Sequence, residues 1–159
     1  MRSVVAKLGA VALVQLALVG VAVAPRLSAR LTGDEYRLRV APVDPIDPFR
    51  GAYVDLDYPD LHLRDERSEA VDGEGTLYVT LVQDGDVWTA GEFTRVRPSG
   101  TPYLACDDRE WRIRCGIESL FLPQDEAAAM EQDVAGGSMV AVVKVDGRGN
   151  AALVRVEAG

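Results

Sequence analysis

The feature that most constrains this chain is an apolar run near its N-terminus, from Leu8 to Ala24, in which Gln15 is the only polar side chain. With Val4–Ala6 added, the run approaches the ~20 residues that a helix needs to cross a bilayer. Lys7 interrupts the span, but a lysine side chain can extend its charge to the headgroups. The run has no polar face, so it does not suit a surface helix of a soluble domain. We expect a cytoplasmic tail at 1–7, a transmembrane anchor at 8–25 and a neck at 26–34.

A cleaved signal peptide is the alternative interpretation of the same segment. Arg2 and Lys7 form a positively charged start, and Ala22-Val23-Ala24 has the small-residue pattern of a cleavage site. Pro25 follows directly, and we expect a proline to block cleavage at that bond. The run is also long for the apolar part of a signal peptide. We therefore favour an uncleaved anchor.

The orientation of the anchor is predicted from the charges around it. Arginines are more frequent after the run, and a strict count of positive charges would place that side in the cytoplasm. A short positive tail ahead of an apolar run behaves instead as a signal anchor. We follow the second rule and expect a single-pass protein of the cell membrane whose domain at 35–159 lies outside the cytoplasm. The charges counted are Arg2 and Lys7 before the run, and Arg26, Arg30, Arg37 and Arg39 after it.

The overall charge argues against nucleic acid as a partner. The chain has 25 acidic and 17 basic residues, which gives a net charge of −8. It has no basic stripe that would release counterions from phosphates. Solubility is the simpler meaning of the acidic excess.

Two cysteines, Cys106 and Cys115, flank a polar insert of eight residues. In an oxidising compartment this spacing suits a disulfide that closes a local loop. Two buried free thiols are an alternative. A metal pair is a weaker one, because the chain has no second cysteine pair and His62 is its only histidine.

Short segments that alternate between polar and apolar residues follow the neck and are typical of β-strands. In Glu35–Val40, for example, Tyr36, Leu38 and Val40 share one face, and arginines take the other. The expected strands are 35–40, 52–58, 76–82, 87–97, 103–106, 111–115, 138–145 and 150–157, with a further extended piece at 116–122.

Turn residues predict how these strands are connected. Asp84-Gly85 is a hairpin signal, and Asp146–Gly149 predicts a second hairpin near the C-terminus. A third is expected around Asp107–Glu110, joining 103–106 to 111–115.

The remaining segments complete the expected fold. Pro59–Gly75 is charged and contains glycine, so we expect a loop. Pro123 opens a helix expected at 124–133, and Gly136 follows its end. The chain is therefore predicted to be mainly β: a small antiparallel β-barrel or sandwich with one short helix, preceded by an N-terminal transmembrane helix.

The stretch before the second strand combines rigidity with a sharp change of direction. Prolines at 42, 45 and 48 fix the backbone in an extended connector that cannot lie in a central strand. Gly51 then marks the change of direction. In the strand that follows, Tyr53 and Tyr58 fall on opposite faces.

Four blocks with distinctive order and spacing run along the domain. They are Pro42-Val43-Asp44-Pro45; Arg50-Gly51 with Tyr53, Leu56 and Tyr58; Tyr78-Val79 with Leu81; and Gly116-Ile117-Glu118 with Phe121 and Pro123. Together they resemble the pattern of the GDYXXLXY family, a bacterial family that is named after its motif and whose function is not established. The resemblance covers nearly the whole chain after the anchor.

The chain departs from that pattern in two places. Ala52 stands where the family has the signature aspartate, and Gln124 and Asp125 stand where the last block would continue. Either that aspartate is catalytic in the family and this chain is inactive, or the family is not an enzyme family. The resemblance implies a membrane-anchored protein, often encoded beside a multi-spanning membrane protein, and it implies no catalytic residues.

These observations lead us to expect a non-enzymatic accessory protein without a cofactor. Its extracytoplasmic domain would bind a multi-spanning membrane protein, and its N-terminal helix would lie in the lipid bilayer. For Arg50 itself we favour a pair with Asp44 or Asp47 that locks the proline turn over presentation of its guanidinium to a partner carboxylate or lipid phosphate. Core packing is the default for Tyr53 and Tyr58. The candidate residues for binding a partner or ligand are Asp44, Asp47, Arg50, Gly51, Tyr53, Tyr58 and Glu118.

Two other classes of function stay open. A barrel mouth lined by Tyr53, Trp88 and Trp111 would hold a lipid or a glycan. A hydrolase is less favoured, and would need Asp44, Asp55, Asp57 and Glu118 to converge. No metal site is expected, because the aspartates match no EF-hand spacing and suit turns.

Overall fold

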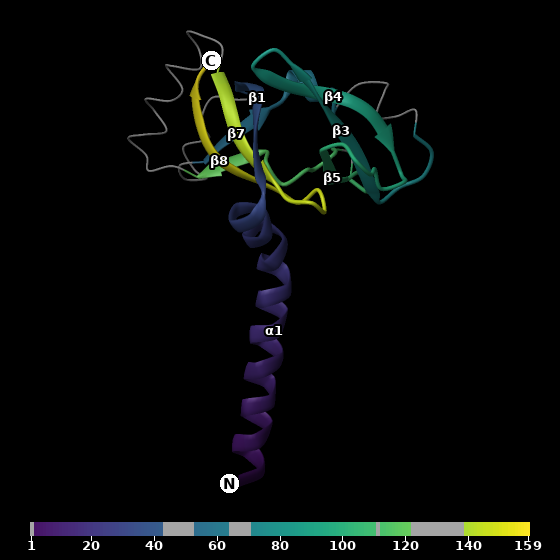
Figure 1. Cartoon of the computed structure of the whole chain (residues 1–159). Helices are drawn as coiled ribbons and strands as arrows, with labels where there is room; N and C mark the ends of the chain where they lie inside the picture. Colours follow the sequence, from purple (N-terminus) through teal and green to yellow (C-terminus); the bar gives the residue numbers. More distant parts are fainter. Residues whose placement is uncertain (1, 43–52, 64–70, 111, 122–138) are drawn as a thin grey trace.

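The computed structural model describes residues 2–42, 53–63, 71–110, 112–121 and 139–159. A long helix, α1 (Arg2–Thr32), projects from a β-rich head (Figure 1). The C-terminus lies at the end of the head away from the helix (Figure 1). From Lys7 to Thr32 the helix is long and apolar enough to cross a membrane, judged by length and composition.

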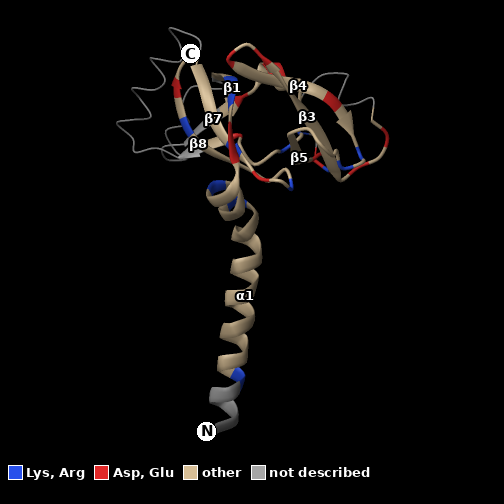
Figure 2. Ribbon diagram, viewed as in Figure 1, with Lys and Arg blue, Asp and Glu red and all other residues tan. Residues whose placement is uncertain are grey.

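The helix continues through the segment expected to be a neck. Pro25 lies inside α1, and the helix ends only at Thr32. A proline removes one intrahelical hydrogen bond, but Ala29 is completely buried against the head. That packing stabilises the last turns, so the chain enters the head as a helix. Figure 2 shows charged residues spread over the head and a long uncharged stretch along α1.

In the described residues, the head is built from antiparallel strands in two sheets. The larger sheet has the order β6-β2-β1-β7-β8 and curves as a half-barrel, and the smaller has the order β4-β3-β5 (Figure 1). The mainly β prediction is confirmed. The strands are β1 (Asp34–Pro42), β2 (Tyr53–Asp57), β3 (Thr76–Asp84), β4 (Val87–Thr94), β5 (Tyr103–Asp107), β6 (Ser119–Phe121), β7 (Met139–Val145) and β8 (Ala151–Ala158).

One hydrophobic core lies between the two sheets. Leu38 of β1, Leu104 of β5 and Val143 of β7 are almost fully buried in it. The opposite face of β1 is polar, as predicted. Arg37 lies on that face and forms an ion pair with Glu157 at 2.9 Å. Alternation along β1 thus places one face in the core and the other in solvent.

Two of the three expected hairpins are confirmed. β3 and β4 are joined at Asp84-Gly85, where Gly85 has φ 61°, and β7 and β8 are joined around Asp146–Gly149. The third is confirmed only in part. β5 pairs along its length with β3, and it meets the following segment through an antiparallel bridge between Asp107 and Arg114 and through the Cys106–Cys115 disulfide. Pairing with β3 buries Leu104 in the core, which a free hairpin would leave exposed.

The segment 59–75, expected to be a loop, starts with a short 3₁₀ helix, η1 (Pro59–Leu61). Leu61 in this helix is completely buried. An apolar side chain therefore holds the start of this charged segment to the core. The expected helix at 124–133 and most of the proline-rich connector lie outside the described residues.

Gly33 allows the helix to meet the head closely. A Cβ atom on Gly33 would lie 2.4 Å from the backbone oxygen of Ala29 and 2.9 Å from backbone atoms of Val145. Backbone atoms cannot give way as a flexible side chain can. The junction, as we call Ser28–Asp34 together with Val145–Asn150, therefore depends on a residue without a side chain.

We predict that Gly33→Ala lowers the free energy of unfolding of the detergent-solubilised full chain by about 1–3 kcal/mol, because the added methyl overpacks the junction. Urea titration followed by tryptophan fluorescence measures this. Gly147→Ala is the control, since a Cβ there meets nothing within 4 Å. Equal stability of the two variants would contradict the close approach at Gly33.

Candidate functional site

Two residues of the signature, Leu56 and Tyr58, are buried. Tyr58 is 3% exposed, and its hydroxyl donates a hydrogen bond to the carbonyl oxygen of Ile117 at 2.7 Å. Burial raises the pKa of Tyr58 far above its ordinary value, and the nearby Glu118 charge raises it further. The hydroxyl therefore stays protonated and acts as a structural donor.

The carboxylate of Glu118 closes the turn that Tyr58 contacts. It accepts hydrogen bonds from the backbone N–H groups of Cys115 and Gly116, the latter at 3.0 Å. Gly116 has φ 84°, a conformation that favours glycine. The block Gly116-Ile117-Glu118 is thus a self-bonded turn, and Tyr58 fixes it against β2.

The cysteine prediction is confirmed: Cys106 and Cys115 form a disulfide, and both are buried. The bond links β5 of the smaller sheet to the turn that leads into β6 of the larger sheet. Closing a loop this short stabilises the folded state by about 2.5–3 kcal/mol in the chain-entropy account. The disulfide and Tyr58 therefore hold the two sheets together at the same place.

The other candidate residues are only partly placed. Asp44, Asp47, Arg50 and Gly51 lie outside the described residues, so their proposed role stays a prediction. Tyr53 begins β2, where its backbone pairs with Phe121 of β6.

The residues of the alternative sites, the barrel mouth and a metal site, are also only partly described. Trp88 packs edge-on against Tyr36, with 5.0 Å between ring centroids, and so contributes to the core boundary. Trp111 lies outside the described residues. Among the residues that the structure does describe, no three His, Cys, Asp or Glu side chains gather in a way that would hold a metal ion.

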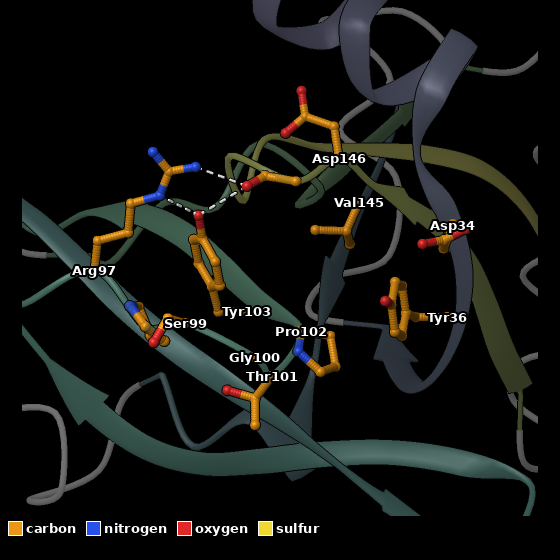
Figure 3. Close-up of a pocket in the computed structure, with 12 residues that line it drawn as sticks. Asp34, Tyr36, Arg97, Ser99, Gly100, Thr101, Pro102, Tyr103, Val145 and Asp146 are labelled. Carbon is orange, nitrogen blue, oxygen red and sulfur yellow. Dashed lines mark hydrogen bonds between the residues drawn. The ribbon is translucent and has the colours of Figure 1, made fainter.

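A cleft that sequence reasoning did not anticipate opens between the two sheets beside the junction (Figure 3). Its volume is about 610 Å³. The start of β1, the loop between β4 and β5, and the turn between β7 and β8 form its walls. The lining residues are Asp34, Tyr36, Arg97, Pro98, Ser99, Gly100, Thr101, Pro102, Tyr103, Val145, Asp146 and Gly147.

Arg97 ties the two walls of this cleft together. Its guanidinium donates hydrogen bonds to the hydroxyl of Tyr103 at 2.5 Å and to the carbonyl oxygen of Gly147 at 2.7 Å (Figure 3). The guanidinium carbon also lies 5.8 Å from the centroid of the Tyr103 ring. No local pattern connects these three residues, because Arg97 and Gly147 are 50 positions apart.

The carboxylate of Asp146 connects the helix to the turn beneath it. Ser28 donates a hydrogen bond to it at 2.6 Å, the side-chain amide of Asn150 donates one at 2.9 Å, and the backbone N–H of Arg148 donates another at 2.9 Å. Burial by itself would raise the pKa of Asp146, but these hydrogen bonds outweigh it and hold the pKa below its ordinary value. The end of the helix is therefore hydrogen-bonded to the head and is not joined to it by a free linker.

We predict that Tyr58→Phe lowers the free energy of unfolding by about 1–3 kcal/mol, because it leaves the buried carbonyl of Ile117 without its donor. Urea titration of the purified chain measures the loss. Tyr78→Phe is the control, because its ring contact with Tyr103 is retained in phenylalanine. Similar losses in both variants would show that the Tyr58 hydroxyl contributes nothing specific.

We also predict that Asp146→Ala broadens the distance distribution between spin labels placed on Leu16 of the helix and Ala158 of the head. Asp86→Ala, an exposed turn carboxylate, should leave it unchanged. Hydrogen bonds to charged groups contribute about 1.5–3 kcal/mol each, so losing them frees the junction. Double electron–electron resonance spectroscopy measures the width of the distribution. An unchanged width in Asp146→Ala would contradict a rigid junction.

The pH dependence of that width follows from the lowered pKa of Asp146. Its stabilising contribution is complete above the ~3.9 of an unfolded aspartate and is lost as pH falls through the lower folded value. The wild-type distribution should therefore broaden only in strongly acidic solution, and that of Asp146→Ala should show no such transition.

Comparison with known proteins gives one match. The family model described as GDYXXLXY protein matches residues 15–156, which include the second half of α1 and nearly all of the head. No curated protein and no solved structure matches the chain.

Proposed function

The chain belongs to the GDYXXLXY protein family, and on that basis we propose that it is a non-enzymatic, membrane-anchored accessory protein. In this proposal α1 crosses the cell membrane once, and the head lies outside the cytoplasm. There the head binds a multi-spanning membrane protein.

The length of the helix supports the anchor. The segment from Lys7 to Arg26 has the ~20 residues that a helix needs to cross a hydrocarbon core. The side chains from Lys7 to Leu27 are exposed in the isolated chain, as expected for a surface that lipid would cover. The disulfide supports an extracytoplasmic head, because such bonds persist in oxidising compartments.

The junction is the observation that carries the proposal of a membrane partner. Ser28 is bonded to Asp146, and Ala29 is buried against the head. A head joined in this way would keep a constant height and orientation above the bilayer. That arrangement suits recognition of a neighbour in the same membrane, because ordering the head on binding would cost little further entropy.

The cleft is the surface that we assign to this recognition. It includes Asp34 and Asp146 of the junction, so it would face the space just above the membrane. Arginine and tyrosine are enriched where protein partners bind, and Arg97, Tyr36 and Tyr103 line it. An extracytoplasmic loop of a membrane protein, with polar groups for Arg97, fits this chemistry.

The signature segment remains part of the proposed surface where its residues are free to take part. Tyr58 and Glu118 are engaged within the fold. Arg50 and Tyr53 keep the recognition role predicted from the sequence. We propose a non-enzymatic role because Ala52 stands where the family has the signature aspartate.

Photo-crosslinking in native membranes tests the proposal. A photoreactive residue at exposed Ser99 or Thr101 should give an adduct with one integral membrane protein, and one at exposed Ala158 should not. Arg97→Ala should reduce the adduct about tenfold, in line with loss of a charged contact. Mass spectrometry identifies the companion and reports whether the bait keeps its N-terminal helix. Adducts of equal yield from Ala158, or none from the cleft, would refute the docking surface.

A further inference from the structure

We infer that the groove where α1 enters the head binds the phosphate group of an anionic phospholipid. The inference rests on the membrane anchor of the proposed function and adds a second site to the cleft. The groove has a volume of about 280 Å³ and lies between the end of α1 and the strands β6 and β8. Its lining includes Arg26 and Arg30 from the helix, and Gly116, Glu118, Ser119 and Leu153 from the head.

The position of the two arginines along the helix places them at the height of lipid headgroups. A helix rises about 1.5 Å per residue, so a bilayer core of ~30 Å that begins at Lys7 ends near Arg26. Arg30 lies one turn further, at about 6 Å by the same rise. Residues four apart share one face of a helix, and both arginines line the same groove.

The groove holds these side chains against an apolar wall. The Arg30 guanidinium donates a hydrogen bond to the carbonyl oxygen of Leu153 at 3.4 Å. A guanidinium has five N–H donors, and the bond to Leu153 uses one of them, so Arg30 keeps donors for a ligand. The nearly buried Ala152 and Leu153 line the same groove beside it.

Glu118 is the acidic residue of the lining, and its carboxylate is already hydrogen-bonded within its own turn. Its carboxylate accepts backbone N–H groups of Cys115 and Gly116. It therefore closes its own turn and does not need either arginine as a partner. The arginines are left to bind an anion from outside the chain.

The charge distribution identifies that anion as a membrane component. The first 33 residues contain four basic residues and no acidic residue, so the rest of the chain carries a net charge of −12. An acidic head is repelled by an anionic bilayer, whereas basic residues lie where α1 meets the head (Figure 2). Arginine binds phosphate in bidentate geometry, and a lipid phosphate is present at this height.

Native mass spectrometry of the detergent-solubilised full chain tests the site. We expect phosphatidylglycerol to bind more tightly than phosphatidylcholine. Arg26→Gln or Arg30→Gln should each weaken phosphatidylglycerol binding about tenfold, as expected for one charged hydrogen-bond pair. Arg148→Gln removes the same charge from the exposed β7–β8 turn and should change binding less than about twofold.

Two further arms make the result decisive. Arg26→Lys keeps the charge and should retain part of the preference for phosphatidylglycerol, which separates loss of binding from loss of folding. Inorganic phosphate should fail to displace the lipid, and displacement would show a site for free phosphate in place of a lipid site. Equal binding of both lipids, or equal weakening by Arg148→Gln, would overturn the site. The cleft and its partner are tested separately by crosslinking, so either proposal can fail without the other.

Discussion

The close contact of Gly33 with the backbone of Val145 is the constraint on which the arrangement of this protein depends. It lets the last turn of α1 pack into the head, with Ala29 buried and Ser28 bonded to Asp146. β1 then starts directly after the helix and pairs with β7. The direction in which the helix leaves the head is therefore set by backbone packing and by one buried carboxylate. The positions of the cleft and of the arginine groove relative to the helix both follow from it.

The signature residues that the structure describes hold the head together. Tyr58 bonds to Ile117, Glu118 closes its own turn, and the disulfide joins that turn to β5. These contacts lie where the two sheets meet at a shared core. A motif can thus mark a family because it specifies the fold, since a buried hydrogen bond that is lost costs more than a surface contact. In the proposed function, other surfaces recognise the partner. The cleft around Arg97 is one such surface, and the fold places it beside the junction.

The helix and the head differ in their charge. The helix carries basic residues near its ends and an uncharged stretch between them, whereas the head is strongly acidic. In the proposed arrangement the arginines at the junction would offset repulsion between the head and anionic lipids. A rigid helix-to-head connection and a lipid contact at the same level would act together, because each limits tilting of the head over the membrane.

The sequence alone was sufficient for features that arise from neighbouring residues. The apolar run predicts the long helix, alternation predicts faces such as that of Leu38, and Asp84-Gly85 predicts a tight hairpin, because each depends on local geometry. The spacing of Cys106 and Cys115 likewise pointed to their disulfide. Only the tertiary structure decided the pairing of β5 with β3, the burial of Leu61 and the helix beyond Pro25. It alone brought Arg97 to Gly147 and Ser28 to Asp146. These outcomes depend on contacts between segments distant in the chain, where the free energy gained by burial selects a partner that no local period encodes.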